Sequence, residues 1–89
     1  MNKRIVIVPT YNEIENIEAL IRKVASLPIS FNILIVDDNS PDGTSQMVKS
    51  LQQEFSQLHL LERKLKNGLG TAYIAGFKWC LQNDYEFIF

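Results

Sequence analysis

Two adjacent carboxylates follow an apolar run near the middle of the chain. Asp37 and Asp38 come directly after residues 33–36, Ile-Leu-Ile-Val, and a polar stretch follows at 39–44. Ligands of open α/β sheets bind just beyond the carboxyl ends of the strands. Acids placed there can accept hydrogen bonds from the donor groups of a ligand. The sequence Asp-Asn-Ser-Pro-Asp-Gly is also good turn chemistry, so a structural turn and a ligand site both remain open at this point.

Two further polar segments also follow apolar runs. Residues 9–13 are Pro-Thr-Tyr-Asn-Glu, and residues 63–70 are Arg-Lys-Leu-Lys-Asn-Gly-Leu-Gly. The ring of Tyr11 can stack on a base, and the carboxylates of Glu13 and Asp38 can accept its N–H groups. Lys64 or Lys66 can approach a phosphate. The structural alternatives are a helix-capping role for Glu13 and solvated positions for the lysines.

The hydrophobic pattern predicts strands that alternate with helices. Strands are expected at 4–8, 32–36, 58–62 and 86–89, and helices at about 13–25, from 41 onward, and at 71–82. Thr10 and Glu13 have capping-box spacing, with Asn12 as an alternative cap, and Ser40 is expected to cap a helix whose first residue is Pro41. This order predicts an α/β fold, with a parallel Rossmann-like sheet, flanking helices and strand order 3-2-1-4. The three polar segments then meet at one edge of the sheet.

Composition excludes several classes of protein. The chain has 89 residues, of which 46% are hydrophobic, and a formal net charge of -1. That length suits one folded domain, and the charge provides no basic field for nucleic acid. The single cysteine, Cys80, excludes a disulfide framework within one chain. The terminal Phe-Ile-Phe would leave an apolar strand uncovered. We therefore expect the chain to be the N-terminal part of a longer protein, truncated in its fourth strand. Self-association through that exposed strand is a further option.

Three stretches carry a family resemblance. These are Val-Pro-Thr-Tyr-Asn-Glu at 8–13 with Asn16, Val-Asp-Asp-Asn-Ser-Pro-Asp-Gly-Thr at 36–44, and Lys-Asn-Gly-Leu-Gly-Thr-Ala-Tyr at 66–73 with Gly76. Together they resemble the dolichol-phosphate (polyprenol-phosphate) mannosyltransferases, inverting family 2 glycosyltransferases of the GT-A fold. The resemblance covers essentially the whole chain, which would be the N-terminal, nucleotide-binding part (1–89) of such a domain. The combination of the second and third stretches is the most specific to this branch.

The resemblance implies a GDP-mannose donor and a dolichyl or polyprenyl phosphate acceptor, at the cytoplasmic face of the membrane. The positions that would hold the nucleotide sugar are Pro9, Tyr11, Glu13, Val36 and Asp38, with Asp37 and Lys66 as further candidates. The family's Asp-x-Asp motif, which holds Mg or Mn, would lie beyond Phe89. The resemblance therefore implies no catalytic residue, no tightly bound metal and no transferase activity in these 89 residues alone.

Three other interpretations remain open. A related family 2 enzyme would move glucose or another sugar, from UDP or GDP, to a lipid phosphate. An inactive nucleotide-binding or self-associating fragment is an interpretation of another class. A redox domain is disfavoured because no Gly-x-Gly-x-x-Gly follows the first strand, and no Walker A loop is present either.

Overall fold

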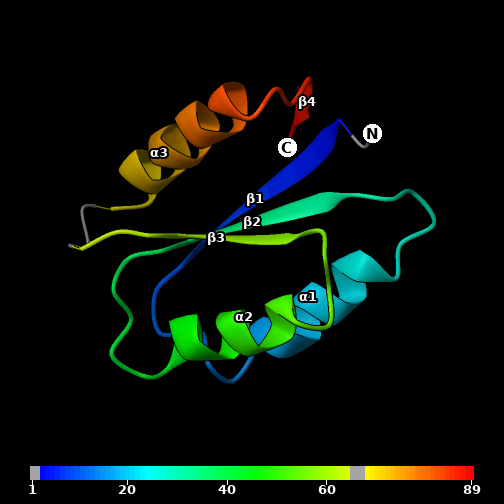
Figure 1. Cartoon of the computed structure of the whole chain (residues 1–89). Coiled ribbons are helices and arrows are strands. Elements are labelled where there is room, and N and C mark those ends of the chain that lie inside the picture. Colours follow the sequence, from blue (N-terminus) through cyan, green and yellow to red (C-terminus); the bar gives the residue numbers. More distant parts are fainter. Residues whose placement is uncertain (1–2, 65–67) are drawn as a thin grey trace.

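The computed structural model describes residues 3–64 and 68–89 and contains a four-stranded parallel sheet (Figure 1). Its strand order is β3-β2-β1-β4, which confirms the predicted topology. The elements are β1 (Arg4–Thr10), α1 (Ile17–Ala25), β2 (Asn32–Asp37), α2 (Thr44–Gln52), β3 (Leu58–Glu62), α3 (Leu69–Gln82) and β4 (Phe87–Ile88).

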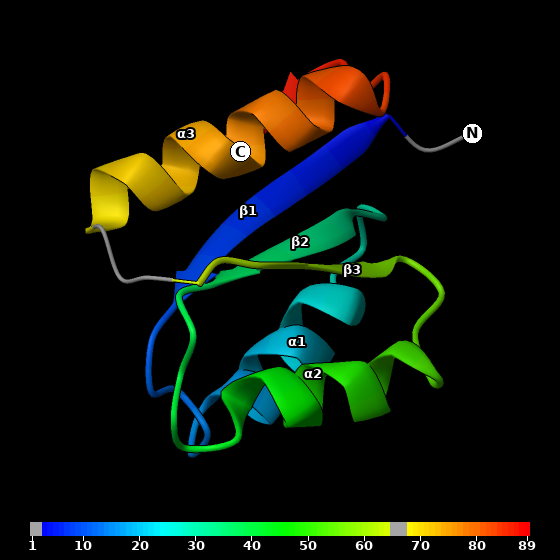
Figure 2. The same ribbon diagram turned by 60° about the vertical axis from the view of Figure 1, so that its left-hand side comes forward.

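Helices cover both faces of the sheet. Figures 1 and 2 show α1 and α2 on one face and α3 on the other. Successive residues of β2 serve these two faces in turn, since Ile33 and Ile35 belong to the core beneath α1 and α2 whereas Leu34 and Val36 belong to the core beneath α3. All four side chains are buried. A strand that is apolar on both faces is what a central parallel strand requires.

Helix α3 approaches the sheet closely at Gly76. A Cβ atom added there would lie 2.9 Å from Cγ2 of Ile7 and 3.1 Å from Cγ2 of Val36. A larger side chain at this position would push the helix away from β1 and β2. Glycine therefore sets the distance between α3 and the sheet.

The outer surface of α3 is apolar and open. Tyr73, Ile74, Phe77 and Leu81 are between 42% and 57% exposed. With Phe89 and other residues near β4 they line a groove of about 570 Å³. We call this feature the α3 groove.

The predicted starts of α1 and α2 and the predicted end of the first strand were wrong. Helix α1 begins at Ile17 instead of 13, and α2 begins at Thr44 instead of Pro41. Strand β1 does not end before Pro9 but continues to Thr10, whose carbonyl accepts the N–H of Asp38 at 3.1 Å. Because hydrogen-bonding groups alternate in direction along a strand, the nitrogen of Pro9 faces the β4 side, beyond the residues that pair with β4.

The predicted caps of these helices were wrong, because the side chains of Thr10 and Ser40 bond to Asp37 and not to the first turn of a helix. The hydroxyl of Thr10 donates to Asp37 at 2.6 Å, so Thr10 and Glu13 form no capping box. Ser40 likewise donates its hydroxyl to Asp37. Asn12 turns the chain with a φ of 57°, a left-handed conformation that asparagine tolerates better than most residues.

Candidate functional site

The loops that follow β1 and β2 are fastened together by side chains of the second loop. The N–H of Asn12 donates to Oγ of Ser40 at 2.9 Å, and the N–H of Glu13 donates to Oγ1 of Thr44 at 3.0 Å. The next amide, of Ile14, donates to Oδ2 of Asp42 at 3.1 Å. Three successive amides of the first loop thus find partners in the second loop or at the first residue of α2, which fixes the backbone of both loops.

Asp42 is itself held by this arrangement. Its Oδ1 accepts the N–H and the hydroxyl of Thr44 at 3.0 and 2.5 Å. Desolvation acts to raise the pKa of Asp42, but the hydrogen bonds from Thr44 and Ile14 outweigh it and hold that pKa below its usual value. The carboxylate is therefore kept ionised as the acceptor that both loops share.

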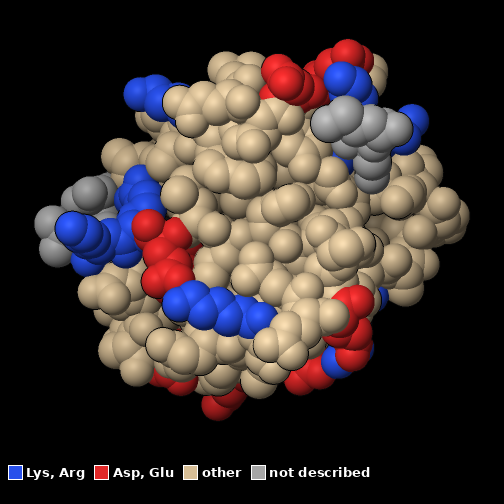
Figure 3. Space-filling view, in the orientation of Figure 1, with Lys and Arg blue, Asp and Glu red and all other residues tan. Residues whose placement is uncertain are grey.

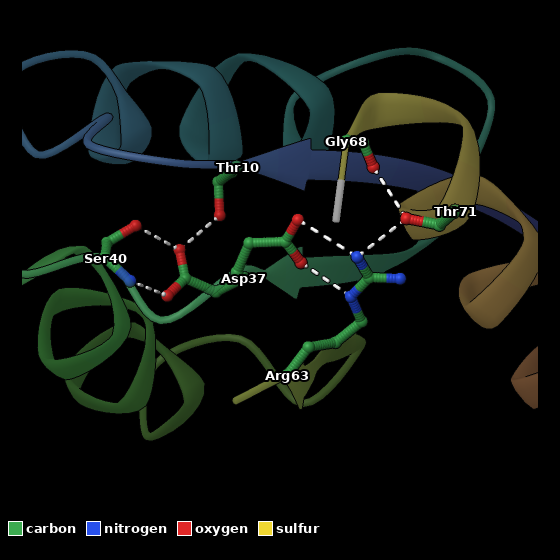
Figure 4. A network of polar contacts seen from close by, with 7 residues as sticks. Thr10, Asp37, Ser40, Arg63, Gly68 and Thr71 are labelled. Atoms are coloured by element: carbon green, nitrogen blue, oxygen red, sulfur yellow. Dashed lines mark hydrogen bonds and ion pairs between the residues drawn. The ribbon is translucent and has the colours of Figure 1, made fainter. Parts of the chain in front are cut away.

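Asp37 organises the turn at the end of β2. Its Oδ1 accepts the hydroxyls of Thr10 and Ser40, both at 2.6 Å, and its Oδ2 accepts the N–H of Ser40 at 3.0 Å. Figure 4 shows the carboxylate lying between these two partners. With a residue exposure of 1%, Asp37 is enclosed by protein. Its carboxylate holds the structure of the turn together.

Asp38 is held by Arg63, which directly follows β3. Nε of Arg63 lies 2.7 Å from Oδ1 of Asp38, and Nη2 lies 3.2 Å from Oδ2, so both oxygens accept a guanidinium N–H. The side chains of Arg63 and Asp38 are 15% and 6% exposed. A buried carboxylate needs such a partner, because an unpaired charge there would be costly.

A second cavity lies at the carboxyl ends of β1 and β2. It has a volume of about 290 Å³ and is lined by Pro9, Thr10, Tyr11, Glu13, Asp38, Gly68 and Ala72. The loop after β1 forms one wall, and the start of α3 forms the other. The cavity therefore combines an aromatic ring, two carboxylates and glycine backbone at the sheet edge where α/β folds bind ligands.

Four of the predicted ligand residues come together in this cavity. Pro9, Tyr11, Glu13 and Asp38 all line it, although they come from the end of β1 and from the loops that follow β1 and β2. The side chain of Val36 instead lies wholly in the core beneath α3, and Asp37 is bonded to Thr10 and Ser40. Lys66 lies outside the described residues. Contact of any of these residues with a nucleotide sugar remains a prediction.

Sequence reasoning missed the residues that hold the site together. Ser40, Asp42 and Thr44 were interpreted as turn or helix-start chemistry, and Arg63 only as the beginning of a polar segment. The spacing of Asp37 and Ser40 is compatible with a local carboxylate-to-amide turn, which was a usable signal. Nothing in the sequence indicates that Arg63 reaches Asp38, because that contact depends on how β3 pairs with β2.

The described residues do not form a metal site. Over 3–64 and 68–89, no three His, Cys, Asp or Glu side chains are grouped so that they could hold a metal ion. The oxygens of Asp37 and Asp38 are already engaged by Thr10, Ser40 and Arg63. In the same part of the chain, no helix is long and apolar enough to cross a membrane.

Two known proteins of similar sequence have names that refer to mannose and to a polyprenol. The chain is 42% identical over 80 residues to an undecaprenyl-phosphate mannosyltransferase of Micrococcus luteus, covering 90% of this chain and 33% of that protein. It is 41% identical over 85 residues to a polyprenol monophosphomannose synthase of Mycolicibacterium smegmatis, covering 94% of this chain and 32% of that protein. The chain thus spans about a third of the length of these curated relatives.

A solved structure of similar fold is a mannosyltransferase from Pyrobaculum calidifontis in complex with GDP-Man and Mn²⁺. The TM-score is 0.81 at 27% identity, over 86% of this chain and 24% of that one. This likeness confirms the predicted GT-A type of parallel sheet. The family model of glycosyl transferase family 2 matches residues 5–88, nearly the whole chain. The chain therefore belongs to glycosyl transferase family 2.

Proposed function

We propose that this chain forms the nucleotide-binding part of an enzyme that transfers mannose from GDP-mannose to a polyprenyl phosphate. The observation that carries the proposal is that Pro9, Tyr11, Glu13 and Asp38 line one cavity at the carboxyl ends of β1 and β2. The names of the two curated relatives support mannose and a polyprenyl phosphate, and the solved neighbour supports GDP-mannose as donor.

The side chains of the cavity suit a nucleoside. The ring of Tyr11 offers a face for a base, and a base or ribose can donate hydrogen bonds to the carboxylates of Glu13 and Asp38. The start of α3 provides backbone at Gly68, where no side chain intervenes. We place the nucleoside in this cavity.

The proposed reaction inverts the anomeric carbon of the sugar. An oxygen of the acceptor phosphate forms the new bond to that carbon, and the bond from the carbon to the diphosphate breaks, so that GDP leaves with the electron pair. The acceptor is anionic at neutral pH and needs little help from a general base. A divalent metal ion, Mg²⁺ or Mn²⁺, would neutralise the leaving diphosphate in the whole enzyme. We place the acceptor at the cytoplasmic face of the membrane, and we expect no transfer by these 89 residues alone.

The proposal is tested by calorimetric titration of GDP and UDP into the chain. We expect GDP to bind at least about tenfold more tightly than UDP. Asp38→Asn should weaken GDP binding by about 10- to 150-fold, since a hydrogen bond to a charged group contributes about 1.5–3 kcal/mol. Ile74→Ala, which changes the outer face of α3, is the control and should bind like the unchanged chain.

Each contrary result has a definite meaning. Tighter binding of UDP would contradict the GDP donor and favour another branch of the family. Absence of binding by both nucleotides would contradict a nucleotide site formed by these residues.

We also propose that the chain self-associates through β4. Phe87 and Phe89 are 54% and 60% exposed at this edge of the sheet, which lies beside the α3 groove. Light scattering should show a mass that rises with concentration. A constant monomer mass would contradict this proposal.

A further inference from the structure

We propose that Arg63 is a positioning residue for nucleotide binding, which holds Asp38 toward the cavity and ties the two walls of the cavity together. The inference rests on the proposed function, because it concerns the same cavity. Arg63 is not among the described residues that line that cavity. Its effect on a ligand is therefore indirect and passes through Asp38 and α3.

The first contact of Arg63 fixes the carboxylate of Asp38. Its guanidinium meets both carboxylate oxygens through two different nitrogens, at 2.7 and 3.2 Å. Such a fork restricts the rotation of a carboxylate more than a single bond does. A carboxylate oxygen has two acceptor sites, so Asp38 can still accept hydrogen bonds from a ligand while Arg63 holds it.

The second contact of Arg63 reaches the opposite wall. Its Nη2 donates to Oγ1 of Thr71 at 2.9 Å, and that hydroxyl donates to the carbonyl of Gly68, also at 2.9 Å. Thr71 lies between Gly68 and Ala72, and both of those neighbours line the cavity. Figure 4 shows the guanidinium between the end of β2 and the start of α3.

The backbone of Arg63 is anchored as well. Its N–H donates to the carbonyl of Asp37 at 2.8 Å, which continues the pairing of β3 with β2. The side chain therefore projects from a fixed point on the sheet. This differs from Arg22 on α1, whose partners Glu18 and Glu54 are about half exposed like Arg22 itself.

The test compares four variants of the chain by calorimetric titration of GDP. Arg63→Met keeps the apolar part of the side chain and should weaken GDP binding at least about tenfold. Arg63→Lys restores the charge without the fork and should recover part of that loss. Thr71→Val removes only the contact with α3 and should have a smaller effect than Arg63→Met. Arg22→Met removes two exposed ion pairs, with Glu18 and Glu54, and should leave GDP binding unchanged.

A double-mutant cycle separates the indirect role from direct contact. If Arg63 acts through Asp38, the combined Asp38→Asn and Arg63→Met variant should bind GDP about as weakly as Asp38→Asn alone. Losses that multiply would show that Arg63 meets the ligand independently, which would overturn the inference. GDP binding by Arg63→Met equal to that of the unchanged chain would overturn it too.

The failures of the two proposals can be told apart. If the unchanged chain does not bind GDP, the proposed function fails and the inference falls with it. If the unchanged chain binds GDP but Arg63→Met and Thr71→Val bind it equally well, only the inference fails. Circular dichroism identifies variants that do not fold. If Arg63→Met does not fold, Arg63→Lys and Thr71→Val test the inference instead, which fails if both bind GDP as tightly as the unchanged chain.

Discussion

The two faces of the sheet differ in how completely they are covered. Beneath α1 and α2, the buried side chains form one closed core whose members are Ile17, Ile21, Ile33, Ile35, Val48, Leu51 and Leu58. On the other face α3 covers β1 and β2 but leaves its own outer surface apolar and exposed. The closed face is built for stability, whereas the α3 face also borders the cavity and the groove.

Charged side chains are present at the ligand edge of the sheet, and another charged residue, Glu86, lines the α3 groove. In Figure 3, acidic and basic groups gather at the left-hand side of the view, where the strands end, and both signs are present. One pair near this end is Lys49 with Glu62, whose atoms lie 2.8 Å apart. Mixed charge at the ligand edge, beside a cavity with two carboxylates, suits recognition by hydrogen bonding more than by net attraction.

The largest effect should come from truncating an isoleucine on the closed face. Ile35 is fully buried, and Ile35→Ala should lower the free energy of unfolding by about 2–5 kcal/mol. Ile74 on the outer face of α3 is 57% exposed, and Ile74→Ala should change it by less than about 0.5 kcal/mol. Urea denaturation measures both, with Ile35→Val as a milder variant. Equal losses would show that the α3 face is as well covered in solution as the other.

The next largest effect concerns the two neighbouring acids. Asp37→Asn replaces a buried acceptor of three hydrogen bonds and should lower the free energy of unfolding by about 1.5–3 kcal/mol. Asp38→Asn should have its main effect on GDP binding. Thermal unfolding and GDP titration of both variants check that Asp37 contributes mainly to stability and Asp38 mainly to GDP binding. A large loss of GDP affinity in a stably folded Asp37→Asn variant would reverse the roles assigned here.

A third prediction compares two glycines of α3. Gly76→Ala should lower the free energy of unfolding by about 1–3 kcal/mol, because the added methyl group would lie 2.9 Å from Ile7. Gly70→Ala meets no atom within 4 Å and should be neutral or slightly stabilising. Chemical denaturation gives both values. A neutral Gly76→Ala variant would mean that α3 can move away from the sheet without loss.

The smallest effect is a pH dependence on the α3 face. The ring of His59 lies 5.3 Å from that of Trp79, and its Nε2 is 3.4 Å from the hydroxyl of Tyr85. Burial lowers the pKa of His59 below its ordinary 6.5. The folded state then binds a proton less readily than the unfolded state. The contribution of neutral His59 to the free energy of unfolding is therefore complete above pH 6.5, and it is lost as the pH falls through the lower pKa of the folded state. Urea midpoints at several pH values should show this loss, and it should be absent in His59→Gln.

The sequence predicted the sheet better than the loops, and the reason is physical. Residues 5–8 and 33–36 are apolar at every position and therefore on both faces, which indicates central parallel strands without knowledge of any neighbour. Strand order then followed from the alternation of strands and helices.

Helix starts failed because they depend on partners from other loops. The amide of Glu13 is satisfied by Thr44 and that of Asn12 by Ser40, about thirty residues away, so the local capping pattern was misleading. Part of the site was nevertheless predicted. Tyr11, Glu13 and Asp38 follow strand ends, and the topology brings strand ends together. The contact of Arg63 with Asp38 could not be predicted, because it requires the register of β3 on β2.

The central claim is that the cavity beside Asp38, and not the α3 groove, binds the nucleotide. Titration of GDP into isotope-labelled chain, followed by amide NMR shifts, tests it most directly. We predict saturable shifts at Tyr11, Glu13, Asp38, Gly68 and Ala72, with the amides of Phe77 and Leu81 unmoved. Shifts confined to Phe77 and Leu81, or none at saturating GDP, would contradict the account.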